Sequence, residues 1–298
     1  MKKQIFFTSI FLFTPLLLTV TVAQDIRREV KRTTEKEVKV VLHSSFGSVN
    51  LEKGTPDKIA EVYYRQKERD KDDHPKVDIN YSVHRDVGDL HIEMHPESSE
   101  EHSSDDGDIR VHANLHFRTD EWYVKLAEGI PLSIEAELGA GKSDFDFSGL
   151  TINDLSISTG ASSSKIRFDQ KNKNMMEDLN IETGVSKFVA ENLNNANFKN
   201  MKFEGGVGSY YLDFGGELDH SVDVNISVGL GSITLVIPQD IGVKVKYEDS
   251  WLSNFSIDDE FIRKRKGVYE SENYASAHGQ MNLFVESGLG SVKIRRSK

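Results

Sequence analysis

The chain of 298 residues carries 37 Lys and Arg against 48 Asp and Glu, a formal charge of −11, and contains no cysteine. The missing cysteine excludes disulfides, thiolate metal sites and a cysteine nucleophile. The acidic balance argues against nucleic acid as a partner, because phosphate binding requires clustered Lys and Arg. Apolar residues make up 37% and charged residues 29%, which is typical of soluble globular chains.

Residues 1–23 have the layout of a secretory signal peptide. Two lysines precede an apolar run from Ile5 to Val22, and Ala23 stands where a signal peptidase would cut, before Gln24. An uncleaved anchor is the alternative, because the apolar run is just long enough to cross a bilayer. We therefore expect an exported protein of the periplasm, the outer membrane surface or the extracellular space, whose mature chain does not span the membrane.

Residues 24–130 form an N-terminal region that is rich in strand patterns and in charged loops. Apolar and polar residues alternate over 77–83, 90–94, 109–117 and 122–126, which predicts strands. The stretch 57–63 fits either a helix or a strand, and propensity alone does not decide between them.

Residues 131–298 are organised by an internal repeat. Each copy has alternating apolar residues, then Gly-x-Gly or Gly-x-Ser, then alternating apolar residues again. Ten of the 22 glycines occupy the two repeat positions, and a degenerate copy surrounds Ser45 and Gly47. The lead glycines are Gly139, Gly160, Gly184, Gly206, Gly229 and Gly288.

This repeat predicts an all-β fold. Alternation is typical of half-buried strands, and glycine between two strands permits a corner with positive φ or close backbone approach. A unit of about 22 residues cannot bury its apolar face alone, so the copies must stack. We expect a stacked, β-helix-like solenoid following the N-terminal β-rich region, with a β-sandwich as the alternative.

The repeat is interrupted near residues 249–280, where the spacing of the lead glycines widens to 59 residues. The interruption contains the aromatic residues Trp251, Phe255, Phe261 and Tyr269 and the basic run Arg263 to Lys266. We expect an inserted loop or hairpin that covers the side of the solenoid.

Histidines in the N-terminal region suggest a metal site. If the strands around 90–94 and 109–117 pair as a hairpin, several imidazoles and one carboxylate converge on one face, a donor set suited to zinc or copper. The simpler interpretation is the wet face of an amphipathic hairpin. The candidate ligands are His91, Glu93, His95, His112 and His116.

Catalytic motifs are missing from the sequence: there is no Gly-x-Ser-x-Gly elbow and no His-Glu-x-x-His. We therefore expect no enzyme and no cofactor. A polysaccharide-active enzyme on a β-helix remains the alternative, since two opposed carboxylates leave no local signature.

The chain resembles the bacterial toast-rack proteins and the related adhesin and cell-wall-active-antibiotic-response domains. The resemblance rests on Pro131-Leu132-x-Ile134 leading to Leu138-Gly139-Ala140-Gly141, on the repeats, and on Ser232-Ile233-Thr234-Leu235-x-Ile237-Pro238. It implies a rack of short strands without catalytic residues, in proteins that modulate envelope-stress signalling or act as surface adhesins.

These observations together predict a non-enzymatic binding or scaffold protein of the bacterial envelope. Its outward Ser, Asp, Lys and Asn side chains, among them Lys165 and Arg167, would face an envelope protein or a glycan. The ends of the solenoid would also offer edges for self-association.

Overall fold

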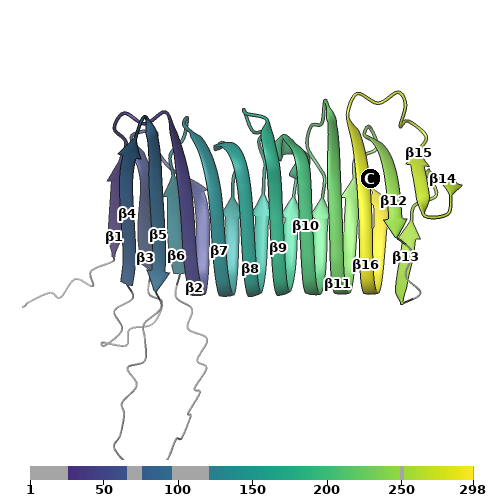
Figure 1. Cartoon of the computed structure of the whole chain (residues 1–298), viewed down its shortest axis with the longest axis horizontal. Coiled ribbons are helices and arrows are strands. Elements are labelled where there is room, and N and C mark those ends of the chain that lie inside the picture. Colours follow the sequence, from purple (N-terminus) through teal and green to yellow (C-terminus); the bar gives the residue numbers. More distant parts are fainter. Residues whose placement is uncertain (1–25, 66–75, 96–120, 249–251, 298) are drawn as a thin grey trace, which may run out of the picture.

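The computed structural model describes residues 26–65, 76–95, 121–248 and 252–297, which form one sheet of 16 strands wound into an elongated stack (Figure 1). The described part has one helical element, the 3-10 helix η1 (Leu193–Ala196). No helix in these ranges is long and apolar enough to cross a membrane.

Seven long strands form the body of the stack, and each is one rung. Neighbouring rungs pair in parallel, which confirms the solenoid and excludes a sandwich of hairpins for the repeats. In Figure 1 each rung descends on the front, bends at the lower edge and returns at the back. We call these parts the front face, the bend edge and the back face. The rungs are β2 (Glu37–Lys53), β7 (Pro131–Asp146), β8 (Thr151–Arg167), β9 (Met176–Glu191), β10 (Phe198–Asp213), β11 (Ser221–Ile237) and β16 (Gln280–Arg296).

The repeat glycines lie at the bend, in both of the roles expected of them. A Cβ on Gly139 would collide with the carbonyl oxygen of Ser45 in the rung below, so the backbones approach too closely for a side chain. Gly231 and Gly290 adopt φ of +135° and +137°, which other residues rarely adopt. The register Gly47↔Gly141 confirms that the degenerate copy is the first rung.

The core lies between the front and back faces. In three rungs a large inward side chain on one side of the bend meets a small one on the other side. The pairs are Leu138 with Ser143, Thr183 with Phe188, and Gly205 with Tyr210.

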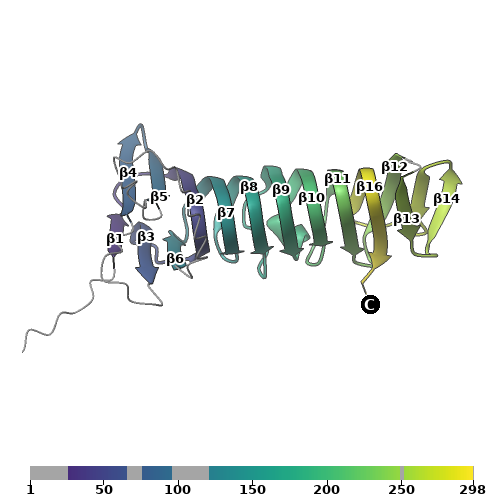
Figure 2. The same cartoon turned by 90° about the horizontal axis from the view of Figure 1, so that it is seen from below.

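The N-terminal region continues the same sheet as two layers, which separate at β2 (Figure 2). The front half of β2 pairs with β5 (Val87–His95), and β5 pairs with β4 (Lys76–His84). The back half pairs with β6 (Glu121–Leu126), followed by β3 (Lys58–Arg65) and β1 (Arg27–Lys31). Residues 58–65 are therefore a strand, and the helical alternative is wrong.

The interruption of the repeat, expected as an inserted loop or hairpin, forms an eighth rung at the end of the stack and then a hairpin. β12 (Gly242–Glu248) pairs with the front half of β16, and β13 (Ser253–Ile257) pairs with its back half. Buried Val243, Val245 and Tyr247 extend the core, which explains why this segment stacks on the end. A hairpin of β14 (Phe261–Arg265) and β15 (Val268–Ser271) follows. The last strand, β16, thus lies between β11 and β12.

A buried arginine holds this end together. The Arg296 side chain is 5% exposed, and its Nη1 donates to the carbonyl oxygens of Pro238 at 2.6 Å and Ile241 at 3.0 Å. Its guanidinium also lies 4.7 Å from the ring centre of Phe261. Burial lowers the pKa of Arg296, although nearby carboxylates such as Glu260 oppose this. The C-terminal strand is thereby fastened to the segment that forms the eighth rung.

Candidate binding surface

The front face carries a grid of outward side chains in two columns, all of them polar except Phe284. Alternation along each strand directs these residues to solvent, and parallel register aligns them from rung to rung, about 4.8 Å apart. We call this set the front grid. The first column is Asp178, Asn200, Asp223, Asn282 and Lys244, and the second is Asn180, Lys202, Asn225, Phe284 and Lys246.

Hydrogen bonds join part of the first column. Asn200 Nδ2 donates to Asp178 Oδ1 at 3.3 Å, and Asn282 Nδ2 donates to Asp223 Oδ1 at 3.0 Å. Each amide is thus held in a fixed direction by the carboxylate of the neighbouring rung.

The amides of the second column are available to a ligand. Asn180 and Asn225 are exposed, and neither makes a side-chain hydrogen bond within the described ranges. An amide offers two donors and an acceptor, which suits the hydroxyl and acetamido groups of a polar chain. Lys202 lies between them and carries the only charge of this column among β9, β10 and β11.

Aromatic rings close the C-terminal end of the front grid. Lys246 Nζ lies 4.9 Å from the ring centre of Phe284, and Lys244 Nζ lies 5.8 Å from that of Tyr274. Tyr274 also donates its hydroxyl to Asn282 at 2.9 Å. Half-buried rings beside amides can pack on the apolar face of a ligand while the amides bind its polar edge.

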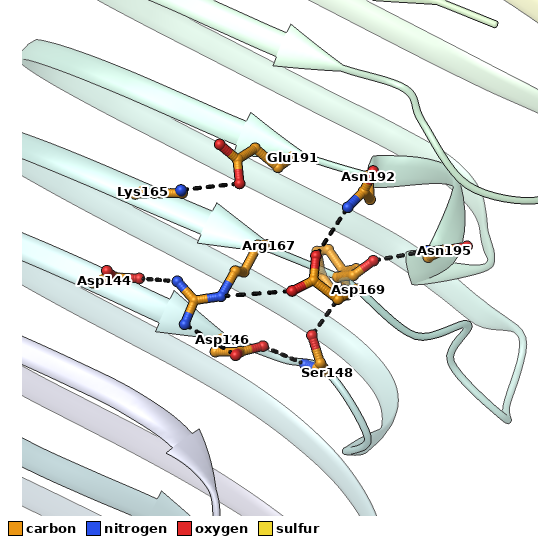
Figure 3. A network of polar contacts seen from close by, with 10 residues as sticks. Asp144, Asp146, Ser148, Lys165, Arg167, Asp169, Glu191, Asn192 and Asn195 are labelled. Atoms are coloured by element: carbon orange, nitrogen blue, oxygen red, sulfur yellow. Dashed lines mark hydrogen bonds and ion pairs between the residues drawn. The ribbon is translucent and has the colours of Figure 1, made fainter.

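The back face presents a different arrangement, shown in Figure 3, in which the charged groups satisfy one another. Arg167 Nη1 lies 2.6 Å from Asp144 Oδ1, and Nη2 lies 3.0 Å from Asp146 Oδ2. Lys165 Nζ lies 2.9 Å from Glu191 Oε2 on the next rung. Lys165 and Arg167 do point outward as expected, but both are occupied by contacts between rungs.

The Arg167 network extends into the turns at the end of the rungs. Asn192 Nδ2 donates to Asp169 Oδ1 at 3.0 Å, and the Asp169 amide donates to Ser148 Oγ at 2.7 Å. Partial burial acts to raise the pKa of Asp146, but hydrogen bonds from Ser148 and the charge of Arg167 outweigh it and lower the pKa. This network therefore ties rungs together and leaves few free groups for a ligand.

Asp213, on the same back face, has no cation beside it in the described part of the chain. Burial raises the pKa of its carboxyl, and the backbone amide of Gly215, which donates to Oδ1 at 3.1 Å, only partly offsets this. The carboxylate of Glu191 acts in the same direction as burial.

The structure describes only some of the candidate metal ligands. His91, Glu93 and His95 lie on β5, where both edges are already paired, with β2 and with β4, over Val87 to Met94. Neither edge of β5 is therefore free to pair with the further strand that the metal-site hypothesis assumed. His112 and His116 lie outside the described residues, and so do residues 1–23. The metal site and the signal peptide therefore remain predictions.

A smaller polar cluster surrounds His95. Its Nε2 lies 3.4 Å from Asp78 Oδ2 and 3.6 Å from Glu93 Oε2. Within the ranges that the structure describes, no group of three or more His, Asp or Glu side chains has the arrangement of a metal site.

Comparison with known proteins supports the repeat fold. A family model described as the N-terminal domain of toast_rack, DUF2154, matches residues 19–190 and 172–236, well over half of the sequence. The chain belongs to the toast-rack family. Among curated proteins, none matches the sequence.

Two crystal structures are similar to the toast-rack chain over 92% of its length. One is a "putative cell adhesion protein" from Clostridium sporogenes, 20% identical, with 99% of that chain covered and a TM-score of 0.42. The other is a "putative adhesin" from Bacteroides fragilis, 11% identical, with 98% covered and a TM-score of 0.33. Similarity at this level carries no argument about what the toast-rack chain binds.

Sequence reasoning named the outward ladders as a class but chose Lys165 and Arg167 from them. Apart from Lys244 and Lys246 on the eighth rung, the residues of the front grid could be read from the same alternation, six and four residues before a lead glycine. What the sequence did not show is which outward charges pair with one another, because the partners lie more than 20 residues away.

Proposed function

We propose that this toast-rack protein is a non-enzymatic, adhesin-like binding protein, exported to the bacterial envelope, whose front grid binds a glycan. The observation that carries the proposal is the column of unengaged amides, Asn180 and Asn225, flanking Lys202 across three consecutive rungs. A polysaccharide repeats its hydroxyl and amide groups at regular intervals, so a regular array can bind several units at once.

The ends of the front grid support this choice of ligand. Phe284 and Tyr274 offer half-buried aromatic rings next to Asn282, the combination that binds the apolar face and the polar edge of a sugar. The grid mixes carboxylates, amides and ammonium groups, so a ligand of one strong charge is less suited to it than a neutral polar chain.

Co-sedimentation with insoluble polysaccharides tests the proposal. Purified protein would be mixed with peptidoglycan, chitin and cellulose, and bound protein measured over a range of concentrations. We expect saturable binding to at least one polymer and no release of reducing sugar. Release of reducing sugar would favour the alternative, a polysaccharide-active enzyme.

Matched variants localise the binding. Asn180→Ala and Asn225→Ala should each weaken binding several-fold, whereas Asn254→Ala should not, because Asn254 is equally an exposed asparagine but follows the bend on the eighth rung. Equal binding by all three variants would exclude the front grid. If no polymer binds and in-cell crosslinking captures an envelope protein through this face, a protein partner replaces the glycan.

A further inference from the structure

A line of apolar side chains follows the bend edge seen in Figure 2, half-buried at Phe46 and Ala140 and exposed from Ala161 onward. Each rung contributes the residue between its two repeat positions, and register pairs that residue with its equivalent in the next rung. We call this the apolar line. Its members are Phe46, Ala140, Ala161, Val185, Val207, Leu230 and Leu289.

The apolar line concentrates the exposed hydrophobic surface of the protein. Val185 is 63% exposed, and Val207, Leu230 and Leu289 are 44%, 46% and 46% exposed. The described residues include seven large hydrophobic side chains with such exposure, and four of them are these. A fifth, Leu252, continues the line on the eighth rung, where its carbonyl accepts from the Gly290 amide at 3.3 Å.

Seven rungs spaced about 4.8 Å apart make the line about 30 Å long. Isolated exposed hydrophobic residues are ordinary, whereas contiguous ones mark surfaces that another molecule covers. The residue between the two repeat positions is the one side chain there that points outward from the bend. A polar residue at this position would suit the fold equally well, yet aliphatic residues recur.

The two flanks of the apolar line differ in charge. The front flank, two residues before each lead glycine, holds Glu137, Ser158, Glu182, Glu204, Ser227 and Glu286. The back flank, three residues after each lead glycine, holds Lys142, Ser163, Lys187, Ser209, Ser232 and Ser291. In the described part of the chain, Lys142, Glu182 and Lys187 make no ion pair with another residue.

The two flanks carry opposite charges in two of the rungs. β7 has Glu137 on one flank and Lys142 on the other, and β9 has Glu182 and Lys187. Where the front flank is glutamate and the back flank is not lysine, the back flank is serine, as in β10 and β16. No rung carries the same charge on both flanks.

We propose that the protein forms a dimer in which the apolar lines of two copies lie against each other, related by a two-fold axis parallel to the stack. This rotation exchanges front and back, so Glu182 of each copy faces Lys187 of the other, and Leu230 faces Leu230. A two-fold axis across the line would instead place the glutamate flanks against each other. Charge therefore selects the parallel arrangement.

The expected dimer is weak. A contact about 30 Å long and roughly 15 Å wide covers about 450 Å² on each copy, less than the ~800 Å² of a standard interface. We therefore expect a dimer that exchanges with monomer in the micromolar range or above. A membrane surface is the less suitable occupant, because the glutamate flank would repel anionic lipid.

Sedimentation velocity over 1 to 200 µM, in low and high salt, tests the proposal; these are about the concentrations at which weak interfaces exchange. Wild-type protein should sediment increasingly as a dimer. Leu230→Lys should raise the dimer dissociation constant about tenfold or more, because it buries an unpaired ammonium. The control Met175→Lys alters an equally exposed hydrophobic residue, 47% exposed, away from the line, and should not change the constant.

Charge exchange tests the direction of the axis without touching the apolar line. Glu182→Lys and Lys187→Glu should each weaken the dimer, and the double variant should restore it. A mixture of the two single variants should also form a heterodimer, because each copy then meets its opposite charge. These variants keep the test independent of the folding of Leu230→Lys.

Monomeric wild-type protein at 200 µM, or a dimer that none of these variants affects, would overturn the proposal. A dimer weakened by Leu230→Lys but not by charge exchange would overturn the parallel axis. Flotation of monomeric protein with phosphatidylcholine vesicles, abolished by Leu230→Lys, would assign the apolar line to lipid instead.

Discussion

The ring of Tyr210 occupies the space that a side chain on Gly205 would need. A Cβ placed on Gly205 would lie 2.7 Å from two carbons of that ring, although the glycine itself has an ordinary strand conformation. The absence of a side chain here serves packing across the bend, in contrast to Gly231, where the backbone conformation itself requires glycine.

Gly205→Ala should therefore destabilise the protein by about 1–3 kcal/mol through overpacking, measured as a lower urea midpoint with an unchanged slope. Tyr210→Phe is the matched control. The Tyr210 hydroxyl is buried without a hydrogen-bond partner in the described part of the chain, so its removal should leave stability unchanged or raise it. A tolerated Gly205→Ala would show that the two faces can separate locally at the bend.

Asp213→Asn should stabilise the protein at pH 7. Burial raises the pKa of Asp213 in the folded state, so the folded chain binds a proton more readily than the unfolded chain and its stability rises as the pH falls through the folded pKa. The asparagine keeps the acceptor for Gly215 and removes the charge. Because the site is half-exposed, we expect a gain of roughly 0.5 kcal/mol at pH 7.

The gain from Asp213→Asn should fade as the pH falls through about 4, the ordinary pKa of an aspartate, and vanish by about pH 3, where the carboxyl is protonated in both states. Urea unfolding of both proteins between pH 3 and pH 8 measures it. Glu217→Gln, a nearby exposed carboxylate, is the control and should show no such gain. A gain that persists at low pH would point to something other than the charge.

Arg296→Met should destabilise the C-terminal end by about 2–4 kcal/mol, since two buried carbonyl oxygens would lose a charged donor. Trypsin should then cut more rapidly at the basic residues of β14, because Phe261, the first residue of that strand, packs on Arg296. Arg295→Met is the control, because Arg295 is half-buried and makes only a distant contact, 5.9 Å, with the ring centre of Tyr211. Equal protease sensitivity of the two variants would show that the buried arginine is not what holds the eighth rung.

The histidine hypothesis predicts that the purified protein retains zinc or copper in equilibrium dialysis. His91→Ala and His95→Ala should each reduce the amount retained. Asp78→Asn separates two forms of the site: loss of metal would place the ligands on β4 and β5, and unchanged binding would require His112 and His116. A protein that retains no metal would end the hypothesis.

Much of the fold could be predicted because one sequence feature, the glycine pair between two alternating segments, has one structural consequence. It gave the rungs, their parallel order, and even the degenerate first rung at Ser45 and Gly47. The eighth rung was missed because it has no glycine pair: its front and back halves are joined by residues 249–252, which do not resemble the repeat. Only the burial of Val243, Val245 and Tyr247 against β16 reveals it.

The binding surface was less predictable, and the reason is pairing between rungs. Lys165 and Glu191 are 26 positions apart, and nothing local in the sequence shows that they neutralise each other. The apolar line was readable in principle, since Val185, Val207, Leu230 and Leu289 occupy the same place in their repeats. Its meaning depends on the bend, which turns that place outward.

The position of β16 has a consequence for how the molecule is completed. The chain builds the eighth rung, β12 and β13, before it reaches the rung that separates it from β11. Until the C-terminal residues are available, two strand edges that belong on either side of β16 have no partner. Rungs from β7 to β11 can each add to a finished neighbour as the chain lengthens, but the final step is an insertion between two strands. The slowest phase of folding should accordingly involve this strand, and a chain truncated before Gln280 would expose two open edges and aggregate.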